Sequence, residues 1–305
     1  MMENRIQRLS QKFALIDVNP PIPGFDKFIA SYLLSGDKIA LVDVGPTVGI
    51  PNLLSALLEV PLNLEDIDYV VVSHIHLDHA GGIGTALKAM PNAKLIVHPR
   101  GRSHLIDPSR LWQGSLETLG ELAVKYGSIE PVPAERIISA TDGMVLDLGE
   151  GNKWEIYLTP GHASHHISLF NAADKLLIAG EAGGICANGI FRVTTPPPFK
   201  LDETLASIDK LISLHPEKIC YAHFGCYANA MERLQRIREK TLQWYKIVGD
   251  AVGEGRKDEE ILDILKKKDG DLVYLNTLGR DYYNREYDLL FNCVRGMALS
   301  ARGQT

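Results

Sequence analysis

The sequence predicts an α/β fold with mixed sheets, followed by a helical region. Two groups of short segments rich in β-branched residues, each with helical stretches beside it, indicate two strand-rich halves. Beyond Gly225, apolar residues recur at helical spacing instead. Strands and helices of one chain pack as layers around a shared core. We therefore expect a main domain over residues 1–225 and a helical carboxy-terminal extension over residues 226–305.

The first group of predicted strands lies between residues 13 and 98. A turn at residues 35–37 joins two of these strands as a hairpin. Residues 51–58 are predicted to be a helix with proline in its first turn. The strands are expected at residues 13–18, 28–34, 39–44, 69–72 and 94–98.

The second group of predicted strands is followed by one helix and one further strand. Asp202 is the expected N-cap of a helix that runs through Leu214 and ends before Pro216. The chain then returns as a strand that leads to His223. The strands of this group are expected at residues 144–148, 154–159, 167–170 and 175–179.

Three helical segments are predicted after Gly225. They cover residues 231–248, 259–268 and 282–299, and the polar, glycine-containing residues 253–258 form a linker between the first two. These helices could cover the rest of the protein, or they could form a lid or a dimer contact. The apolar pattern does not separate these roles.

The composition is that of a globular protein, with 305 residues, 45% hydrophobic and 23% charged. A net charge of −6 gives no basic surface of the kind that nucleic-acid binding needs. No apolar run is as long as a membrane span, and residues 1–11 contain no apolar signal core. We therefore expect a cytoplasmic protein that acts on neither nucleic acid nor membranes. Four cysteines without metal-type spacing are expected to be free thiols: Cys186, Cys220, Cys226 and Cys293.

The most informative segment is Ser-His-Ile-His-Leu-Asp-His-Ala-Gly-Gly at residues 73–82. A strand that ends just before it delivers these side chains to one rim of a sheet, where neutral imidazole and carboxylate are the usual zinc ligands. Four such groups within six residues are too crowded for one closed structural site, so they favour two metals that share them. The alternative is a solvent-exposed, histidine-rich turn. The four candidate ligands are His74, His76, Asp78 and His79.

Four further segments, one before residues 73–82 and three after them, extend this pattern, each with an acidic residue or a histidine after a predicted strand. They supply Asp43, His162, Glu181 and His223. Together with HxHxDHAGG at residues 74–82, and in this order, they resemble the motifs of the metallo-β-lactamase superfamily, a group of mostly di-metal hydrolases. The resemblance covers residues from about 13 to 225 and implies a four-layered αββα sandwich.

The resemblance also implies a metal-dependent hydrolase of small-molecule ester, thioester or lactone-type acyl substrates. A metal-bound hydroxide would attack the acyl carbon, and Asp78 is the candidate catalytic residue because it could pass a proton to the leaving group. We expect about two zinc ions per chain, with iron or manganese as alternatives, and a homodimer is one option for the assembly. His74, His76 and His162 would hold one metal, and Asp78, His79 and His223 the other, with Glu181 between them.

Glu181 departs from the family pattern, in which the bridging residue is usually aspartate. Its extra methylene moves the carboxylate by about 1.5 Å. Three arrangements follow: the metals sit differently, Glu181 binds only one of them, or the second site is occupied more weakly. The alternative is that Glu181 only caps a turn before Gly183 and Gly184.

Other residues are expected around the metals. Asp43 is the leading candidate to orient a metal-bound imidazole, since buried carboxylates need partners, and otherwise it belongs to a strand-end turn. His166 is expected to be structural, and His165 is either pocket wall or surface. Residues 19–27, 99–115 and 190–199 are expected to be loops over the metals. These loops offer Phe25, Trp112 and Phe191 as apolar walls and Arg110 or Arg192 as anion contacts.

Two other functions stay open. An iron-dependent redox enzyme, similar to the sulfur dioxygenases of the superfamily, would use the same ligands, because such sites also accept iron. A non-catalytic binding protein would carry a degenerate site, which the full set of candidate ligands disfavours. The sequence does not specify the substrate, although residues 182–185 lack the tyrosine that follows the bridging residue in acyl-homoserine lactonases.

Overall fold

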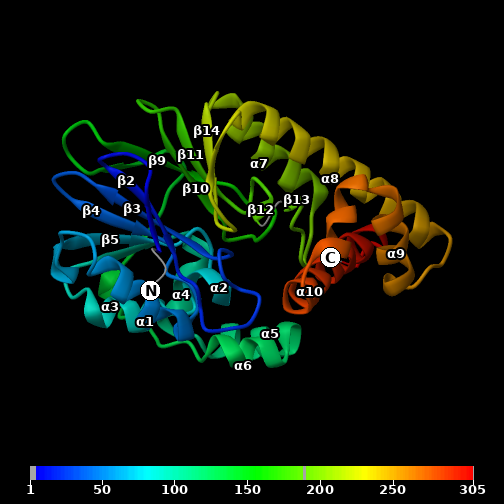
Figure 1. Ribbon diagram of the computed structural model, residues 1–305, viewed down its shortest axis with the longest axis horizontal. Coiled ribbons are helices and arrows are strands. Elements are labelled where there is room, and N and C mark those ends of the chain that lie inside the picture. Colours follow the sequence, from blue (N-terminus) through cyan, green and yellow to red (C-terminus); the bar gives the residue numbers. More distant parts are fainter. Residues whose placement is uncertain (1–4, 188–189, 305) are drawn as a thin grey trace.

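The structure is a computed structural model that describes residues 5–187 and 190–304. Two β-sheets face each other at its centre, and helices cover the outer face of each sheet (Figure 1). The aromatic side chains of Phe13, Tyr32 and Trp154 fill part of the core between the sheets. The predicted fold class, α/β layers with mixed sheets and a helical carboxy-terminal region, is therefore confirmed.

The first sheet comes from the first half of the chain and has seven strands in the described residues, in sequence order. Its first four strands pair antiparallel, and its last four pair parallel. Parallel strands are covered on both faces, which explains the continuous apolar runs before residues 72 and 98. The strands are β1 (Ile6–Arg8), β2 (Phe13–Asp17), β3 (Ala30–Ser35), β4 (Ile39–Val42), β5 (Ile67–Val71), β6 (Lys94–Val97) and β7 (Ile137–Ser139).

The second sheet has six strands in the part of the chain that is described, in the order β15-β14-β11-β10-β9-β8. Every strand predicted in this half is present, whereas β15 and a separate two-stranded ribbon of β12 and β13 were not predicted, because each is only three residues long. The strands are β8 (Met144–Asp147), β9 (Lys153–Leu158), β10 (Ile167–Asn171), β11 (Leu176–Gly180), β12 (Ile185–Ala187), β13 (Ile190–Arg192), β14 (Lys218–Tyr221) and β15 (Cys226–Ala228).

Helices α1 (Ile50–Leu57) and α3 (Ile83–Ala89) cover the outer face of the first sheet. A short helix, α2 (Leu77–Ala80), lies at the end of β5. The expectation of a loop over residues 99–115 is wrong, because this region forms the helices α4 (Pro99–Ile106) and α5 (Ser109–Leu119), followed by α6 (Glu121–Tyr126). Two glycines and many polar residues in this segment conceal its helical apolar pattern.

The outer face of the second sheet packs against α7 (Leu201–Ser213) and α8 (Ala230–Gly253). Asp202 is not the N-cap of α7: Lys200 holds that position, and Asp202 lies in the first turn, where a carboxylate faces the positive end of the helix dipole. The predicted domain boundary at residue 225 stays a prediction, since β15 still pairs with β14 beyond it.

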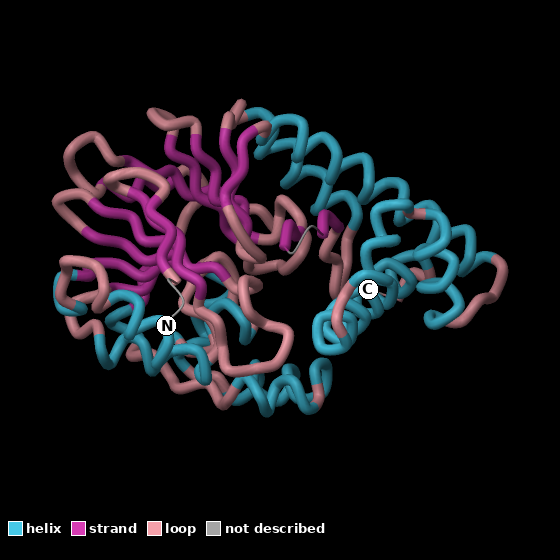
Figure 2. Tube along the Cα trace, in the orientation of Figure 1, coloured by secondary structure: helices cyan, strands magenta, loops and turns pink. Residues whose placement is uncertain are grey.

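The predicted carboxy-terminal helices are present. They are α8, α9 (Asp258–Lys268) and α10 (Arg280–Ala301), and a 3₁₀ segment, η4 (Gly270–Thr277), precedes α10. Figure 2 shows these helices as an extension on one side of the two strand layers, with α10 turned back toward α5 and α6. Among the described residues, no helix has an apolar stretch long enough to cross a membrane.

Candidate metal centre

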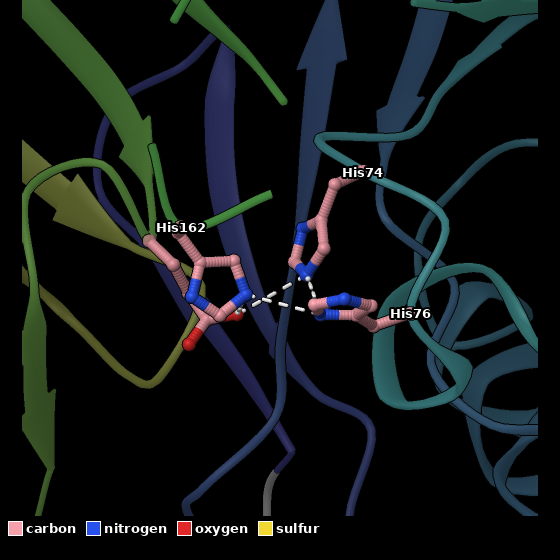
Figure 3. Close-up of side chains that lie close together, drawn as sticks. His74, His76 and His162 are labelled. Carbon is pink, nitrogen blue, oxygen red and sulfur yellow. Dashed lines mark hydrogen bonds and ion pairs between the residues drawn. The ribbon is translucent and has the colours of Figure 1, made fainter. Parts of the chain in front are cut away.

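The candidate ligands meet at the rim where both sheets end. His74 and His76 lie in the loop after β5, and Asp78 and His79 lie in α2. The other candidates come from the second sheet: His162 follows β9, Glu181 follows β11, and His223 follows β14. Figure 3 shows His162 pointing across the gap between the sheets toward His74 and His76.

The first group of ligand atoms comes from His74, His76, His162 and Glu181. Nδ1 of His76 is 3.0 Å from Nε2 of His74 and 3.0 Å from Nε2 of His162. Oε2 of Glu181 is 2.9 Å from Nε2 of His162 and 3.2 Å from Nε2 of His74. Ligand atoms of a tetrahedral zinc site lie about 3.3 Å apart, given zinc–nitrogen bonds of about 2.0–2.1 Å. The four side chains therefore fit around one cation.

The second group consists of Asp78, His79 and His223. Oδ2 of Asp78 is 3.5 Å from Nε2 of His79 and 3.5 Å from Nε2 of His223. The Glu181 carboxylate also reaches this group, with 3.3 Å from Oε2 to Nε2 of His79 and 3.5 Å from Oε1 to Nε2 of His223. Glu181 thus lies between the two groups, in the position that a ligand shared by two cations would take.

Three of the candidate imidazoles have a lowered pKa, which favours the neutral form that metal ligation requires. Burial lowers the pKa of His76 and of His223 to about 3, and it lowers the pKa of His74 well below its usual value. Burial acts to raise the pKa of Glu181, but the surrounding imidazoles, above all His162 and His223, outweigh it and hold the pKa well below its usual value. The site therefore offers ring lone pairs and a carboxylate at neutral pH.

His79 differs from the other imidazoles. Burial acts to lower its pKa, but the carboxylates of Asp78, Asp43 and Glu181 outweigh burial and raise the pKa well above its usual value. Within the described residues, neither of its two buried ring nitrogens has a hydrogen-bond partner of good geometry. Buried polar atoms are rarely left in this state. A divalent cation would offset the negative charge of these carboxylates and give the imidazole a partner.

Asp43 lies where its predicted orienting role requires. It is buried at the end of β4, with Oδ2 at 3.3 Å from Nδ1 of His79. It also accepts hydrogen bonds from the backbone N–H and the hydroxyl of Ser73, and this hydroxyl is 3.0 Å from Nδ1 of His74. One carboxylate therefore contacts a candidate ligand in each group, directly for His79 and through Ser73 for His74.

Thr194 was not identified from the sequence. Its hydroxyl donates to Oε1 of Glu181 at 3.0 Å and lies 3.0 Å from Nδ1 of His162. It follows β13 in a segment without any motif, and its only signal in the sequence is its place just before the stiff Pro196–Pro198 run. His166 has the structural role that was expected, because its Nε2 accepts the backbone N–H of Glu181 at 3.0 Å.

Thr194→Val should weaken metal binding by about 10- to 100-fold, since partners that orient metal ligands contribute about that much. Valine keeps the shape of threonine but cannot donate to Glu181. Thr241→Val is the matched control, because it removes a buried hydroxyl that donates within α8, to the carbonyl of Ile237 at 2.7 Å. Competition with a zinc chelator measures both variants. If Thr194→Val binds zinc as tightly as Thr241→Val does, Thr194 does not orient the ligands.

A cavity of about 370 Å³ opens beside the candidate ligands. Helices α5, α6 and α10 and the prolines at 196 and 197 form its walls, and both Arg110 and His165 line it. His165 is therefore pocket wall. Phe25, Trp112 and Phe191, expected as apolar walls, are not among the lining residues. They pack instead into the hydrophobic cores beneath the site.

Arg192, expected as an anion contact, is not among the described residues that line the cavity. Its Nε donates to Oε2 of Glu286 on α10 at 2.9 Å, and Oε1 of Glu286 accepts from Arg285 at 2.9 Å and 3.0 Å. All three side chains are buried. The guanidinium of Arg285 lies 3.9 Å from the ring centroid of Phe28, which stacks on His223 at 4.2 Å. This buried ion triad thus ties α10 to the site.

Comparisons with known proteins agree with this geometry. The chain is 27% identical over 238 residues to the metallo-beta-lactamase fold-containing protein ST1585 of Sulfurisphaera tokodaii, covering 75% of this chain and 87% of that protein. It is 24% identical over 175 residues to a hydroxyacylglutathione hydrolase of Idiomarina loihiensis, covering 57% of this chain and 53% of that protein.

The fold is also similar to a solved structure. The metallo-beta-lactamase family protein TTHA1429 of Thermus thermophilus superposes with a TM-score of 0.70 at 20% identity, over 97% of this chain and 95% of that one. The likeness therefore includes the carboxy-terminal helices. The family model of the metallo-beta-lactamase superfamily matches residues 25–223, which is more than half of the chain. The chain belongs to the metallo-beta-lactamase superfamily.

Proposed function

We propose that this protein is a dinuclear, zinc-dependent hydrolase of small-molecule esters, thioesters or lactone-type acyl substrates. The observation that supports this most directly is the Glu181 carboxylate between two groups of candidate ligands. Two divalent cations held by these residues would lower the pKa of bound water, so that a hydroxide nucleophile would be available near neutral pH, and they would polarise the acyl oxygen. A carboxylate between them offsets their mutual repulsion.

The chain itself supplies orientation, a proton-carrying group and a partly enclosed cavity. Asp43, Ser73 and Thr194 fix the directions of the imidazoles and of Glu181 through hydrogen bonds and ion pairs. Asp78 lines the cavity with its side chain 16% exposed. The Asp78 carboxyl group could therefore pass a proton to the leaving group, which is the role of a general acid.

A thiol nucleophile is not needed for this reaction, and the cavity does not offer one in reactive form. Cys293 lines the cavity, but burial raises the pKa of its thiol. The sulfur also accepts the backbone N–H of Thr195 at 3.4 Å. Since the thiolate is the nucleophilic form, Cys293 stays unreactive at neutral pH, and water is the expected nucleophile.

The proposal is tested with protein that has been stripped of metal and then reloaded. Stripped protein should hydrolyse no ester, thioester or lactone, and added zinc should restore hydrolysis. His76→Ala and His223→Ala should abolish hydrolysis while keeping the circular dichroism spectrum of the parent, because their proposed role is ligation. If zinc restores no hydrolysis but iron supports oxygen consumption, the protein is a redox enzyme. If no metal supports either reaction, it is a binding protein.

A further inference from the structure

We infer that the cavity binds an uncharged, apolar acyl chain between α5–α6 and α10, and that Gly114 determines how long a chain it accepts. The inference rests on the proposed function, because it names the substrate class of the same site. Its physical basis is the apolar surface that the walls leave open, the sparse charge of the lining and an unexplained glycine on the wall.

Four leucines leave apolar surface open to the cavity. Leu111 and Leu119 on α5, Leu122 on α6 and Leu289 on α10 all line it, and all four are only half-buried. Most leucines of this chain that belong to the core are almost fully buried. Half-buried apolar side chains around a cavity next to candidate metal ligands are typical of a small-molecule site. An acyl chain laid between these helices would remove that surface from water.

The charges of the lining argue against an anionic tail on the substrate. Among the described lining residues outside the two ligand groups, Arg110 is the one arginine or lysine, and it is exposed at the start of α5. Binding of carboxylate or phosphate groups usually employs bidentate or clustered cationic donors. The described lining on α6 and α10 carries no positive charge and consists of Leu122, Tyr126, Leu289, Asn292 and Cys293. An uncharged acyl chain fits this surface better.

Gly114 lies on the face of α5 that borders the cavity. Leu111, Gly114, Ser115, Thr118 and Leu119 all line the cavity, and their spacing places them on one side of a helix. A Cβ at residue 114 would meet no atom within 4 Å. Neither packing nor the backbone therefore requires glycine here, although glycine is unfavourable inside a helix. What the missing side chain provides is room in the cavity.

The test compares esters of one leaving group with acyl chains from acetyl to decanoyl. For the parent, kcat/KM should rise about fourfold per added methylene over the shorter chains, which is the gain from burying one methylene. Gly114→Phe should lower the ratio of octanoyl to acetyl turnover by at least about tenfold. Gly249→Phe is the control, because Gly249 lies within α8, away from the cavity, and its Cβ would also meet no atom within 4 Å. It should keep the parent ratio.

Binding separates a failure of this inference from a failure of the proposed function. Metal-stripped parent and Gly249→Phe should bind octanamide more tightly than acetamide in a calorimetric titration, and Gly114→Phe should lose this preference. If the zinc-loaded protein hydrolyses no ester yet shows this preference, the hydrolase proposal fails and the apolar site stands. The inference is overturned if the parent turns over and binds short and long acyl chains equally well. It is also overturned if Gly114→Phe keeps the ratio of octanoyl to acetyl turnover that the parent has.

Discussion

Glu181→Ala is expected to bind one metal instead of two and to hydrolyse acyl substrates at least about 100-fold more slowly than the parent. Residues that only orient metal ligands contribute about 10- to 100-fold to metal affinity or activity. Glu181 is expected to contribute more, because it is itself a candidate ligand. Its Oε2 lies within 3.3 Å of Nε2 of His162, His74 and His79. Without this carboxylate two cations would repel each other with less charge compensation, so the more weakly held ion leaves first.

Glu181→Asp is the matched control, because it keeps the charge and shortens the side chain by about 1.5 Å. It should bind two metals and keep substantial activity, with altered metal preference. The measurement is metal content and turnover for both variants beside the parent. If Glu181→Ala keeps two metals and full activity, Glu181 is only a turn residue before Gly183, and any bridge comes from water or another carboxylate.

Glu286→Gln is expected to lower the free energy of unfolding by about 3–5 kcal/mol, the usual loss when a buried ion pair is broken by removing one partner. The variant leaves Arg192 and Arg285 buried without a counter-charge. Because Arg285 packs on Phe28, which stacks on His223, we also expect looser metal binding in the second group. Urea denaturation measures the change in stability.

Glu217→Gln is the control for this variant. Glu217 pairs with Lys175 at 2.7 Å on the surface, where both side chains are more than half exposed, and such pairs contribute about 0–1 kcal/mol. If Glu286→Gln and Glu217→Gln lower the free energy of unfolding by equally small amounts, the triad does not stabilise the fold.

The triad also predicts a pH dependence. Burial acts to raise the pKa of Glu286, but Arg192 and Arg285 outweigh it and hold this pKa below its usual value. Because the pKa is depressed in the folded state, Glu286 contributes fully to the free energy of unfolding at pH values above the ordinary pKa range of glutamate. This contribution is lost as the pH falls through the folded-state pKa. The parent and Glu286→Gln should therefore differ in stability at neutral pH and converge in acid, as urea titrations at several pH values would show.

The candidate ligands could be predicted because most of them follow the end of a strand, and Asp78 and His79 come a few residues after His74 in the same motif. Strand ends meet at one rim of a sheet, so local patterns around His74, His162, Glu181 and His223 place these side chains near one another without knowledge of the loops. Asp43 could be predicted for the same reason, because it comes directly after β4. The α/β class and the carboxy-terminal helices could be predicted for a similar reason, since apolar spacing is a local property.

The residues that were missed, such as Thr194, or given a wrong role, such as Arg192, depend on contacts between distant segments. Thr194 reaches Glu181 and His162 from a loop with no motif, and Arg192 turns to Glu286 on a helix 94 positions later. Helix α4 and most of α5, which forms a cavity wall, were taken for a loop over residues 99–115, because half-buried leucines beside a cavity give a weaker helical pattern than a full core face. Burial and pairing across such distances leave no local signal in the sequence.

The central claim is that this chain holds two metals through the seven side chains of the two ligand groups. Elemental analysis of protein purified without chelators, combined with quantification of the chain, measures it most directly. We expect about two divalent ions per chain, zinc first among them, and about one in Glu181→Ala. A reproducible content of one ion per chain in the parent, with Asp78, His79 and His223 free of metal in a crystal structure, would contradict it.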